Sequence, residues 1–230
     1  TAVTEPGPTA YIYPGQGIQA RGMGLDEMST SKAARRVWER ADAHTRAALG
    51  FSVIALVRDN PTEMTARGVT YRHPDGLLNL TQFTQVALAT VAMATTARLA
   101  EAGALVEDAA FAGHSLGEYT ALSAYGRVMP VETTISIVFQ RGSTMHTLVE
   151  RDENGASNYR MGALRPNQAG IPAADVEDYV ERIARESGEF LQIVNYNLAD
   201  SQYAVAGTIA GLDALAADAD ERAAEFGGRR

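Results

Sequence analysis

The stretch "DAAFAGHSLGEYTALSAYG", residues 108–126, decides how the chain folds. Its first six residues are mostly small and apolar, as in a short buried strand, and from Leu116 the apolar residues return at helical spacing. Ser115 stands where the strand gives way to the helix, between Gly113 and Gly117. Residues this small, two before and two after a serine, allow a sharp, strained turn that exposes the hydroxyl. The pattern predicts a nucleophilic serine, and the alternative is a glycine-rich turn with an incidental serine.

Two backbone N–H groups are candidates for an oxyanion hole. The N–H of Leu116 opens the expected helix and faces the place where an acyl oxyanion would form. A second donor is the N–H of Gln16, in the loop "YPGQGIQA" (13–20), which follows an expected strand at 10–13. This loop also fits the G-x-G-x-x-A pattern of dinucleotide-binding turns. Such a turn opens a helix at once, whereas "RGMGLDEMSTS" intervenes here, so we do not expect NAD binding.

Further elements follow from apolar periodicity, caps and turn residues. Residues 29–50 offer a Ser or Thr N-cap, then a helical pattern, and Gly50 as a stop, and Gly103 ends a second helix that starts at residue 81. Pro130 starts a third, 131–151, and "DENGASN" then reads as a turn-rich linker. After it the order is β-α-β-β-α, a ferredoxin-like unit without its last strand. These elements are a strand at 159–164, a helix at 173–186, strands at 190–196 and 203–206, and a helix at 212–225.

Composition narrows the functional class. The chain has 230 residues, of which 46% are hydrophobic, and a net charge of −8, so nucleic acid and membrane surfaces are poor partners. It has no cysteine, which excludes disulfides and thiol nucleophiles and fits a reducing compartment. No secretory signal or spanning segment is visible. We expect a cytoplasmic location.

Arg141 lies inside the expected helix 131–151, near Phe139 and directly before Gly142, which permits close backbone approach. A lone helical arginine is usually a solvated surface residue. The sharper interpretation is a fork that binds a substrate carboxylate through two parallel hydrogen bonds. From these residues alone, the surface interpretation is favoured.

The four histidines, His44, His73, His114 and His146, show no metal-ligand spacing, so we expect no metal site. His114 adjoins Ser115, but neighbours at an elbow point in different directions, which makes it a poor candidate base. In elbow enzymes of this chain order the base histidine comes well after the serine. His146 is the only histidine that follows Ser115.

Five motifs in this order resemble the malonyl-CoA:acyl-carrier-protein transacylases: "YPGQGIQ", "TQVAL", "GHSLGEYTAL", "FQRG" and "VNYNLADSQYAVAG". The segment after the arginine resembles more closely the malonyl/palmitoyl transferase domain of fungal-type (type I) fatty acid synthases. The resemblance makes Ser115 the acyl-accepting nucleophile and the N–H groups of Gln16 and Leu116 the oxyanion hole. Arg141 becomes the clamp for the malonyl carboxylate, which reverses the interpretation of that residue alone. Supporting positions are Gln85, His114 and Asn197.

The resemblance also implies the reaction. Malonyl, and in the fungal-type synthases palmitoyl, passes between CoA and the phosphopantetheine thiol of acyl carrier protein through an acyl-serine intermediate. No cofactor is bound, since the CoA thioester and the carrier phosphopantetheine are substrates. The implied partners are malonyl-CoA, an acyl carrier protein domain and the other domains of a fatty acid synthase.

The implied fold is α/β, with an α/β-hydrolase-like core built on a parallel sheet and an inserted ferredoxin-like α+β subdomain. We expect a tail or linker at 1–8, the core at 9–154 and the subdomain at 155–230, both truncated at the C-terminus. The family's base histidine lies beyond the insertion, so it is expected beyond Arg230, and the chain by itself is expected to be inactive or nearly so. Two alternatives stay open: a serine hydrolase that transfers to water, and a noncatalytic structural piece of a multienzyme.

Overall fold

A computed structural model describes residues 7–153 and 155–227 of the chain. The chain divides into two compact units, Thr1–Leu148 and Val149–Arg230, and each is described by itself. The sequence had placed this boundary after residue 154. Most of the expected tail, residues 1–6, lies outside the described residues.

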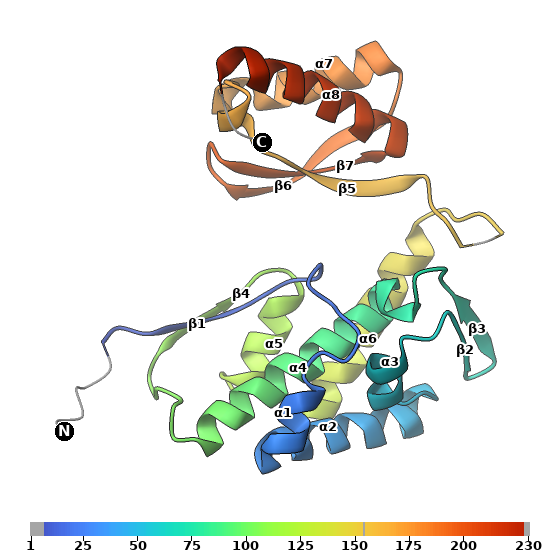
Figure 1. The fold of residues 1–230 in the computed structure, drawn as a ribbon, viewed down its shortest axis with the longest axis vertical. Coiled ribbons are helices and arrows are strands. Elements are labelled where there is room, and N and C mark those ends of the chain that lie inside the picture. Colours follow the sequence, from blue (N-terminus) through green and yellow to red (C-terminus); the bar gives the residue numbers. More distant parts are fainter. Residues whose placement is uncertain (1–6, 154, 228–230) are drawn as a thin grey trace. The chain divides into compact units, whose positions relative to one another are not determined.

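The first unit consists mainly of helices that pack beside a short parallel pair of strands (Figure 1). The strands are β1 (Ala10–Tyr13) and β4 (Ala110–Gly113), paired in register from Ala10 opposite Ala110 to Tyr13 opposite Gly113. The helices are α1 (Leu25–Thr30), α2 (Lys32–His44), α3 (Val53–Asp59), α4 (Thr81–Glu101), α5 (Leu116–Ala124) and α6 (Val131–Leu148).

The parallel pairing brings the residues after β1 next to the residues after β4. The register continues beyond the strands, because the N–H of His114 donates to the carbonyl of Tyr13 at 3.1 Å. The phenol of Tyr13 hydrogen-bonds the hydroxyl of Thr96 on α4 at 3.0 Å. Burial raises the pKa of the Tyr13 phenol, so this group stays neutral and holds β1 against α4.

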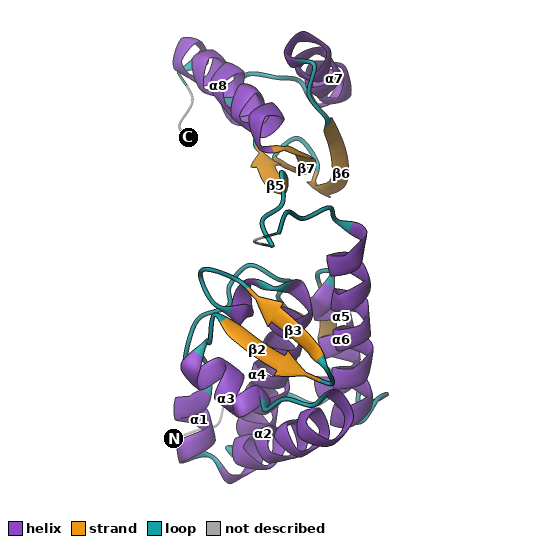
Figure 2. Cartoon of the chain, turned by 90° about the vertical axis from the view of Figure 1, so that its right-hand side faces the viewer, coloured by secondary structure: helices purple, strands orange, loops and turns teal. Residues whose placement is uncertain are grey.

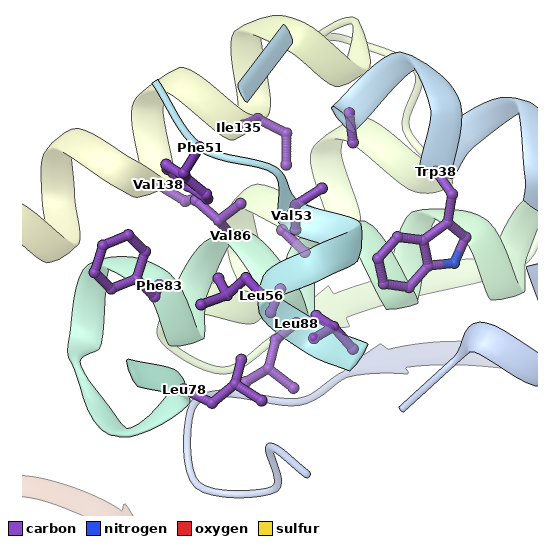
Figure 3. Packing of buried hydrophobic residues seen from close by; sticks show 14 of the residues in the cluster. Trp38, Phe51, Val53, Leu56, Leu78, Phe83, Val86, Leu88, Ile135 and Val138 are labelled. Carbon is purple, nitrogen blue, oxygen red and sulfur yellow. The ribbon is translucent and has the colours of Figure 1, made fainter. Parts of the chain in front are cut away.

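The core of the first unit lies between α2, α3, α4 and α6. Helix α4 buries most of its surface, which requires small or apolar residues all round it. Trp38 from α2, Phe83 from α4 and Ile135 from α6 are fully buried, and Figure 3 shows them as parts of one apolar cluster with residues of α3 between them. Helix α6 approaches α4 closely at Gly142, where a Cβ atom would lie 2.4 Å from the Cα of Gln82.

A buried carboxylate orders the turn between α2 and α3. Asp42 accepts hydrogen bonds from Ser52 Oγ and from Arg46 Nε, the latter at 2.6 Å. A third comes from the backbone N–H of Ile54 at 3.1 Å. Burial would raise the pKa of the Asp42 carboxyl, but these three donors outweigh it and hold that pKa below its ordinary value.

The structure bears out the helix expected within 29–50, with its serine N-cap and its stop at Gly50, and adds elements that the sequence did not predict. Ser31 has extended backbone and caps α2 by accepting from the N–H of Ala34, so α1 and α2 are separate. At the other end, Thr45–Leu49 form a π-helix that stops at Gly50. The chain also forms a hairpin of β2 (Glu63–Ala66) and β3 (Val69–Arg72), drawn as a pair of arrows in Figure 2.

The second unit is a three-stranded antiparallel sheet with two helices. Its elements are β5 (Tyr159–Leu164), α7 (Val176–Ser187), β6 (Leu191–Leu198), β7 (Gln202–Thr208) and α8 (Ile209–Phe226). The strand order is β5-β7-β6, so the last strand in sequence lies between the other two. A separate core forms where Val205 and Tyr203 of β7 meet Val180 and Ile183 of α7. Within the described residues of both units, no helix combines the length and apolar character that crossing a membrane requires.

Candidate active site

Ser115 occupies a strained elbow between β4 and α5. Its backbone has a φ of 55° and a ψ of −110°, a region that residues with a Cβ rarely adopt. Such a conformation costs about 1–3 kcal/mol and persists only where the surrounding structure enforces it. The side chain of Ser115 is exposed. The turn predicted from the glycine spacing is therefore present, and it presents the hydroxyl outward.

Two glycines make the elbow sterically possible. A Cβ on Gly113 would lie 2.0 Å from the carbonyl carbon of Gly117, and a Cβ on Gly117 would lie 2.0 Å from the carbonyl oxygen of Tyr13. Neither space admits even a methyl group. The close approach allows α5 to begin directly after the strand and to pack its first turn against the end of β1.

Of the two N–H groups proposed for an oxyanion hole, that of Leu116 belongs to the elbow, and that of Gln16 follows Gly15, which lies against the elbow. The N–H of Leu116 is the first of α5 and has no partner within its helix, as is general for a first helical residue. The side chain of Gln16 anchors its loop, because its Nε2 donates a hydrogen bond to Thr81 Oγ1 at 3.2 Å. Its neighbour Gly15 lies so close to the elbow that a Cβ there would be 2.9 Å from Nδ1 of His114. Neither N–H group donates a hydrogen bond to an acceptor within residues 7–153 and 155–227.

Arg141 of α6 reaches the nucleophile. Its Nη2 donates to Ser115 Oγ at 2.9 Å, and its Nη1 donates to Oε1 of Gln85 at 2.9 Å. Gln85 is fully buried on α4 and therefore rigidly placed. No carboxylate of the described residues lies within 4.0 Å of the guanidinium. The structure thus places at the elbow a cation whose charge is not compensated by a neighbouring acid.

Two side chains at this site were not predicted from the sequence. The guanidinium carbon of Arg141 lies over the ring of Tyr119, 5.6 Å from its centroid. The thioether of Met145 lies 3.6 Å from Nε2 of Gln85. The available signal was helical spacing, since Tyr119 follows Ser115 by four residues and Met145 follows Arg141 by four.

The hydrogen-bond partner shown for Ser115 Oγ is Arg141, and two of the four histidines have other partners. His44 on α2 pairs with Ser136 Oγ at 2.7 Å, and His73 accepts from a backbone N–H in its own loop. His146 lies on α6, five residues after Arg141.

Two supporting positions keep their roles as predictions. His114 directly precedes the nucleophile, at the end of β4. Asn197 belongs to β6 of the second unit. Across the described residues no group of three or more His, Asp or Glu side chains is arranged to hold a metal ion.

Comparison with known proteins adds an independent line of argument. The fatty acid synthase subunit beta of Saccharomyces cerevisiae is 36% identical over 249 residues, which cover 90% of this chain and 12% of that protein. The subunit of the same name from Schizosaccharomyces pombe is 35% identical over 258 residues, covering 94% of this chain and 12% of that protein. The chain therefore corresponds to a small part of these relatives.

Solved structures match nearly all of the chain. FabD from Acinetobacter baumannii superposes with a TM-score of 0.71 and 25% identity, covering 94% of this chain and 59% of that one. An acyl-carrier-protein S-malonyltransferase from Burkholderia pseudomallei gives a TM-score of 0.68 and 30% identity, covering 96% and 60%. A malonyl-transacylase solved in complex with its type II polyketide acyl-carrier protein gives 0.68 and 26%, with the same coverage. The chain spans about three fifths of these neighbours.

The family model described as "Acyl transferase domain" matches residues 10–222. The match includes both units, the Ser115 elbow and the helix that carries Arg141. The chain belongs to the acyl transferase domain family.

Proposed function

We propose that this chain carries the acyl-accepting site of a malonyl-CoA:acyl-carrier-protein transacylase of fatty acid synthesis. The observation that carries the proposal is the 2.9 Å contact between Arg141 Nη2 and Ser115 Oγ. It puts a carboxylate-binding group beside an exposed serine in a strained elbow. An acyl group that bears a carboxylate close to its thioester, as malonyl does, would engage both residues at once.

The reaction follows from these positions. Ser115 Oγ attacks the thioester carbon of malonyl-CoA and loses its proton to a base, and the carbonyl oxygen becomes an oxyanion. The N–H groups of Leu116 and Gln16 would hold that oxyanion, with the N-terminus of α5 adding a favourable dipole. The C–S bond then breaks, the CoA thiolate takes up a proton, and an ester on Ser115 remains. The phosphopantetheine thiol of the carrier protein attacks this ester in the second half-reaction.

The guanidinium of Arg141 has hydrogen bonds to spare. It carries five N–H groups, of which one goes to Ser115 and one to Gln85. One N–H on each terminal nitrogen and the N–H on Nε stay available for a substrate carboxylate. This arrangement would favour malonyl over acyl groups without a carboxylate.

The finer description of the fold belongs to this proposal. The β1–β4 pair with the elbow supports an α/β-hydrolase-like core, because the serine follows a parallel strand and opens a helix. The β5-α7-β6-β7-α8 order with sheet order β5-β7-β6 supports a ferredoxin-like subdomain.

The general base is part of the proposal as well. On the resemblance to the transacylases, we infer that the base is a histidine that follows the second unit and that the 230-residue chain alone transfers slowly. Imidazole in solution can replace a missing histidine. We expect added imidazole to accelerate acylation of Ser115 by malonyl-CoA in proportion to its concentration, and an unchanged rate would refute this inference.

The partners follow from the relatives. The yeast proteins are fatty acid synthase subunits, and one solved neighbour is bound to its acyl-carrier protein. For this chain we propose an acyl carrier protein as acceptor and the other parts of a fatty acid synthase as companions. Palmitoyl is proposed as a second acyl group, on the resemblance to fungal-type synthases.

The test compares an acyl donor that carries a carboxylate with acyl donors that lack one. In Arg141→Ala, the rate of Ser115 acylation by malonyl-CoA should fall about 10- to 100-fold, since a charge-assisted bidentate contact is lost. Acylation by acetyl-CoA or palmitoyl-CoA should change little. Arg36→Ala, which removes an exposed arginine of α2, is the matched control. Equal losses for all donors would refute the carboxylate contact, and malonate released to water at the transfer rate would favour a hydrolase.

A further inference from the structure

We propose that Tyr119 is a positioning residue for Arg141. Its ring lies beneath the guanidinium carbon and so fixes where a substrate carboxylate lies relative to Ser115. The inference deepens the proposed function and rests on it for the substrate. One part of the inference does not depend on the substrate: Tyr119 restricts the motion of the Arg141 side chain.

The position of Tyr119 follows from helix geometry. Ser115 is the N-cap of α5, and Tyr119 lies four residues later, one turn along the same face. From there its ring reaches the guanidinium, whose carbon lies 5.6 Å from the ring centroid. That distance is within the range of a cation–π interaction. One helix therefore supplies the nucleophile, an oxyanion donor and the support for the cation.

Arg141 needs such support because its side chain is long and comes from another helix. A free arginine loses about 1.5–2 kcal/mol of rotamer entropy when it is fixed. Nη1 is bonded to Gln85 and Nη2 to Ser115, but the bond to Ser115 is given up when Oγ attacks the substrate, and the bond to Gln85 alone leaves the group free to swing. The Tyr119 ring, over which the guanidinium carbon lies, restricts that motion. The contact with Gln85 and the contact with Tyr119 together define the place of the group.

The chemistry of the supports matters as much as their position. An aspartate or glutamate would hold the guanidinium firmly, but it would neutralise the charge that a substrate carboxylate needs. Tyr119 and Gln85 are both neutral, and no carboxylate of the described chain lies within 4.0 Å of Arg141. Other arginines of the same unit, such as Arg40 and Arg46, are held by acidic partners. The site thus orders a cation without neutralising it.

The experiment removes the ring, and a variant that removes only the hydroxyl is the control. Tyr119→Leu and Tyr119→Met remove the ring face but fill apolar space, and either one suffices if the other does not fold. Tyr119→Phe keeps the ring, and the lost hydroxyl has no hydrogen-bond partner among the described residues. Two quantities are measured by NMR on each chain: the dissociation constant of malonate, with acetate as reference, and the order parameter of the Arg141 Nε–H bond without ligand.

We expect malonate to bind about 3- to 10-fold more weakly to the Leu and Met variants, the range that a partly buried cation–π contact supports. The Phe variant should bind within about twofold of the wild type, and acetate binding should not change. The order parameter of Arg141 Nε–H should fall in the Leu and Met variants and not in the Phe variant. A general loss of packing would not produce this separation between Phe and the aliphatic residues.

The outcomes separate the two proposals. If Arg141→Ala binds malonate as well as the wild type, the carboxylate contact of the proposed function is wrong. The order parameter then decides the role of Tyr119 by itself. If the Leu and Met variants keep both the malonate affinity and the order parameter of the wild type, the positioning role is overturned.

Discussion

Backbone strain at Ser115 predicts that glycine gives a more stable protein than alanine at this position, the reverse of their usual order in helices and strands. Replacing the serine by alanine or by glycine removes the hydroxyl and its contact with Arg141 in both cases. The two variants differ only in the Cβ atom. Alanine keeps the clash that a φ of 55° and a ψ of −110° impose, and glycine relieves it. We therefore expect Ser115→Gly to be the more stable protein.

The magnitude follows from two opposing contributions. Relief of the backbone strain favours glycine by about 1–3 kcal/mol. The greater freedom of glycine in the unfolded chain opposes this by about 0.5–1 kcal/mol. Central values of about 2 and about 0.75 kcal/mol leave a net difference of about 1 kcal/mol in favour of Ser115→Gly, and the full ranges span about 0 to 2.5 kcal/mol. In a chain of this size, 1 kcal/mol corresponds to about 2–4 °C in the melting temperature.

The assay is urea unfolding of both variants, followed by circular dichroism. The free energies of unfolding are compared after checking that the two variants have the same m-value, the slope of that free energy against urea concentration. The matched control is the same pair of substitutions at Ser143, inside α6, where glycine should be less stable than alanine by about 1 kcal/mol. If alanine is as stable as glycine at position 115, or more stable, the elbow is not strained and the reasoning fails.

Two further predictions concern the scaffold of the site. Gly117→Ala should destabilise the first unit by about 1–3 kcal/mol or more, because its Cβ would lie 2.0 Å from the carbonyl oxygen of Tyr13. Gly162→Ala, which meets only a leucine methyl at 3.3 Å, should cost less in the same unfolding assay, and equal costs would contradict the steric argument. Asp42 has a pKa below its ordinary value in the folded chain, so its contribution to stability is present above about pH 4 and is lost as pH falls through the folded pKa. Asp42→Asn should therefore lower the free energy of unfolding at pH 7 by about 1–3 kcal/mol, and this free energy should fall less steeply with decreasing pH than in the wild type. An unchanged pH dependence would show that Asp42 does not cause the loss of stability in acid.

The sequence predicted the elements whose signals are local. Strands β1 and β5 have the expected bounds, and α4 starts at the expected residue, because short strand-forming runs and apolar helical spacing mark them. The elbow was predictable because the glycine spacing reflects a steric requirement at Gly113 and Gly117. The helix within 29–50 was predictable for the same reason, because Ser31 supplies its N-cap and Gly50 its stop. Helix α1, which precedes it, has no side-chain cap and no buried residue, so no comparable signal marked it.

The β2–β3 hairpin had a signal that was overlooked. Its two-residue turn places Arg67 at a φ of 49° and Gly68 at a φ of 79°. A turn with two positive φ values matches the twist of a tight hairpin, and glycine at its second position is typical. Arginine at the first position is unusual, and for that reason the strand propensity on both sides did not lead to a hairpin prediction.

The contacts of Arg141 were beyond local reasoning. Taken alone, the residue is a helical arginine, and only the resemblance to a family gave it a role. Its meeting with Ser115 depends on how α6 packs against α4 at Gly142, a tertiary event that no local pattern encodes. The support from Tyr119 depends on the same packing. Sequence periodicity identifies which face of a helix is buried, but it does not identify which element packs against that face.

The central claim is that Ser115 accepts the acyl group, and peptide mapping by mass spectrometry tests it most directly. The chain is incubated with malonyl-CoA in the presence of imidazole and digested, and the modified residue is located. We expect a malonyl ester on Ser115 and none in Ser115→Ala. A label that persists in the alanine variant, or a wild-type chain that takes up no label under these conditions, would contradict the account.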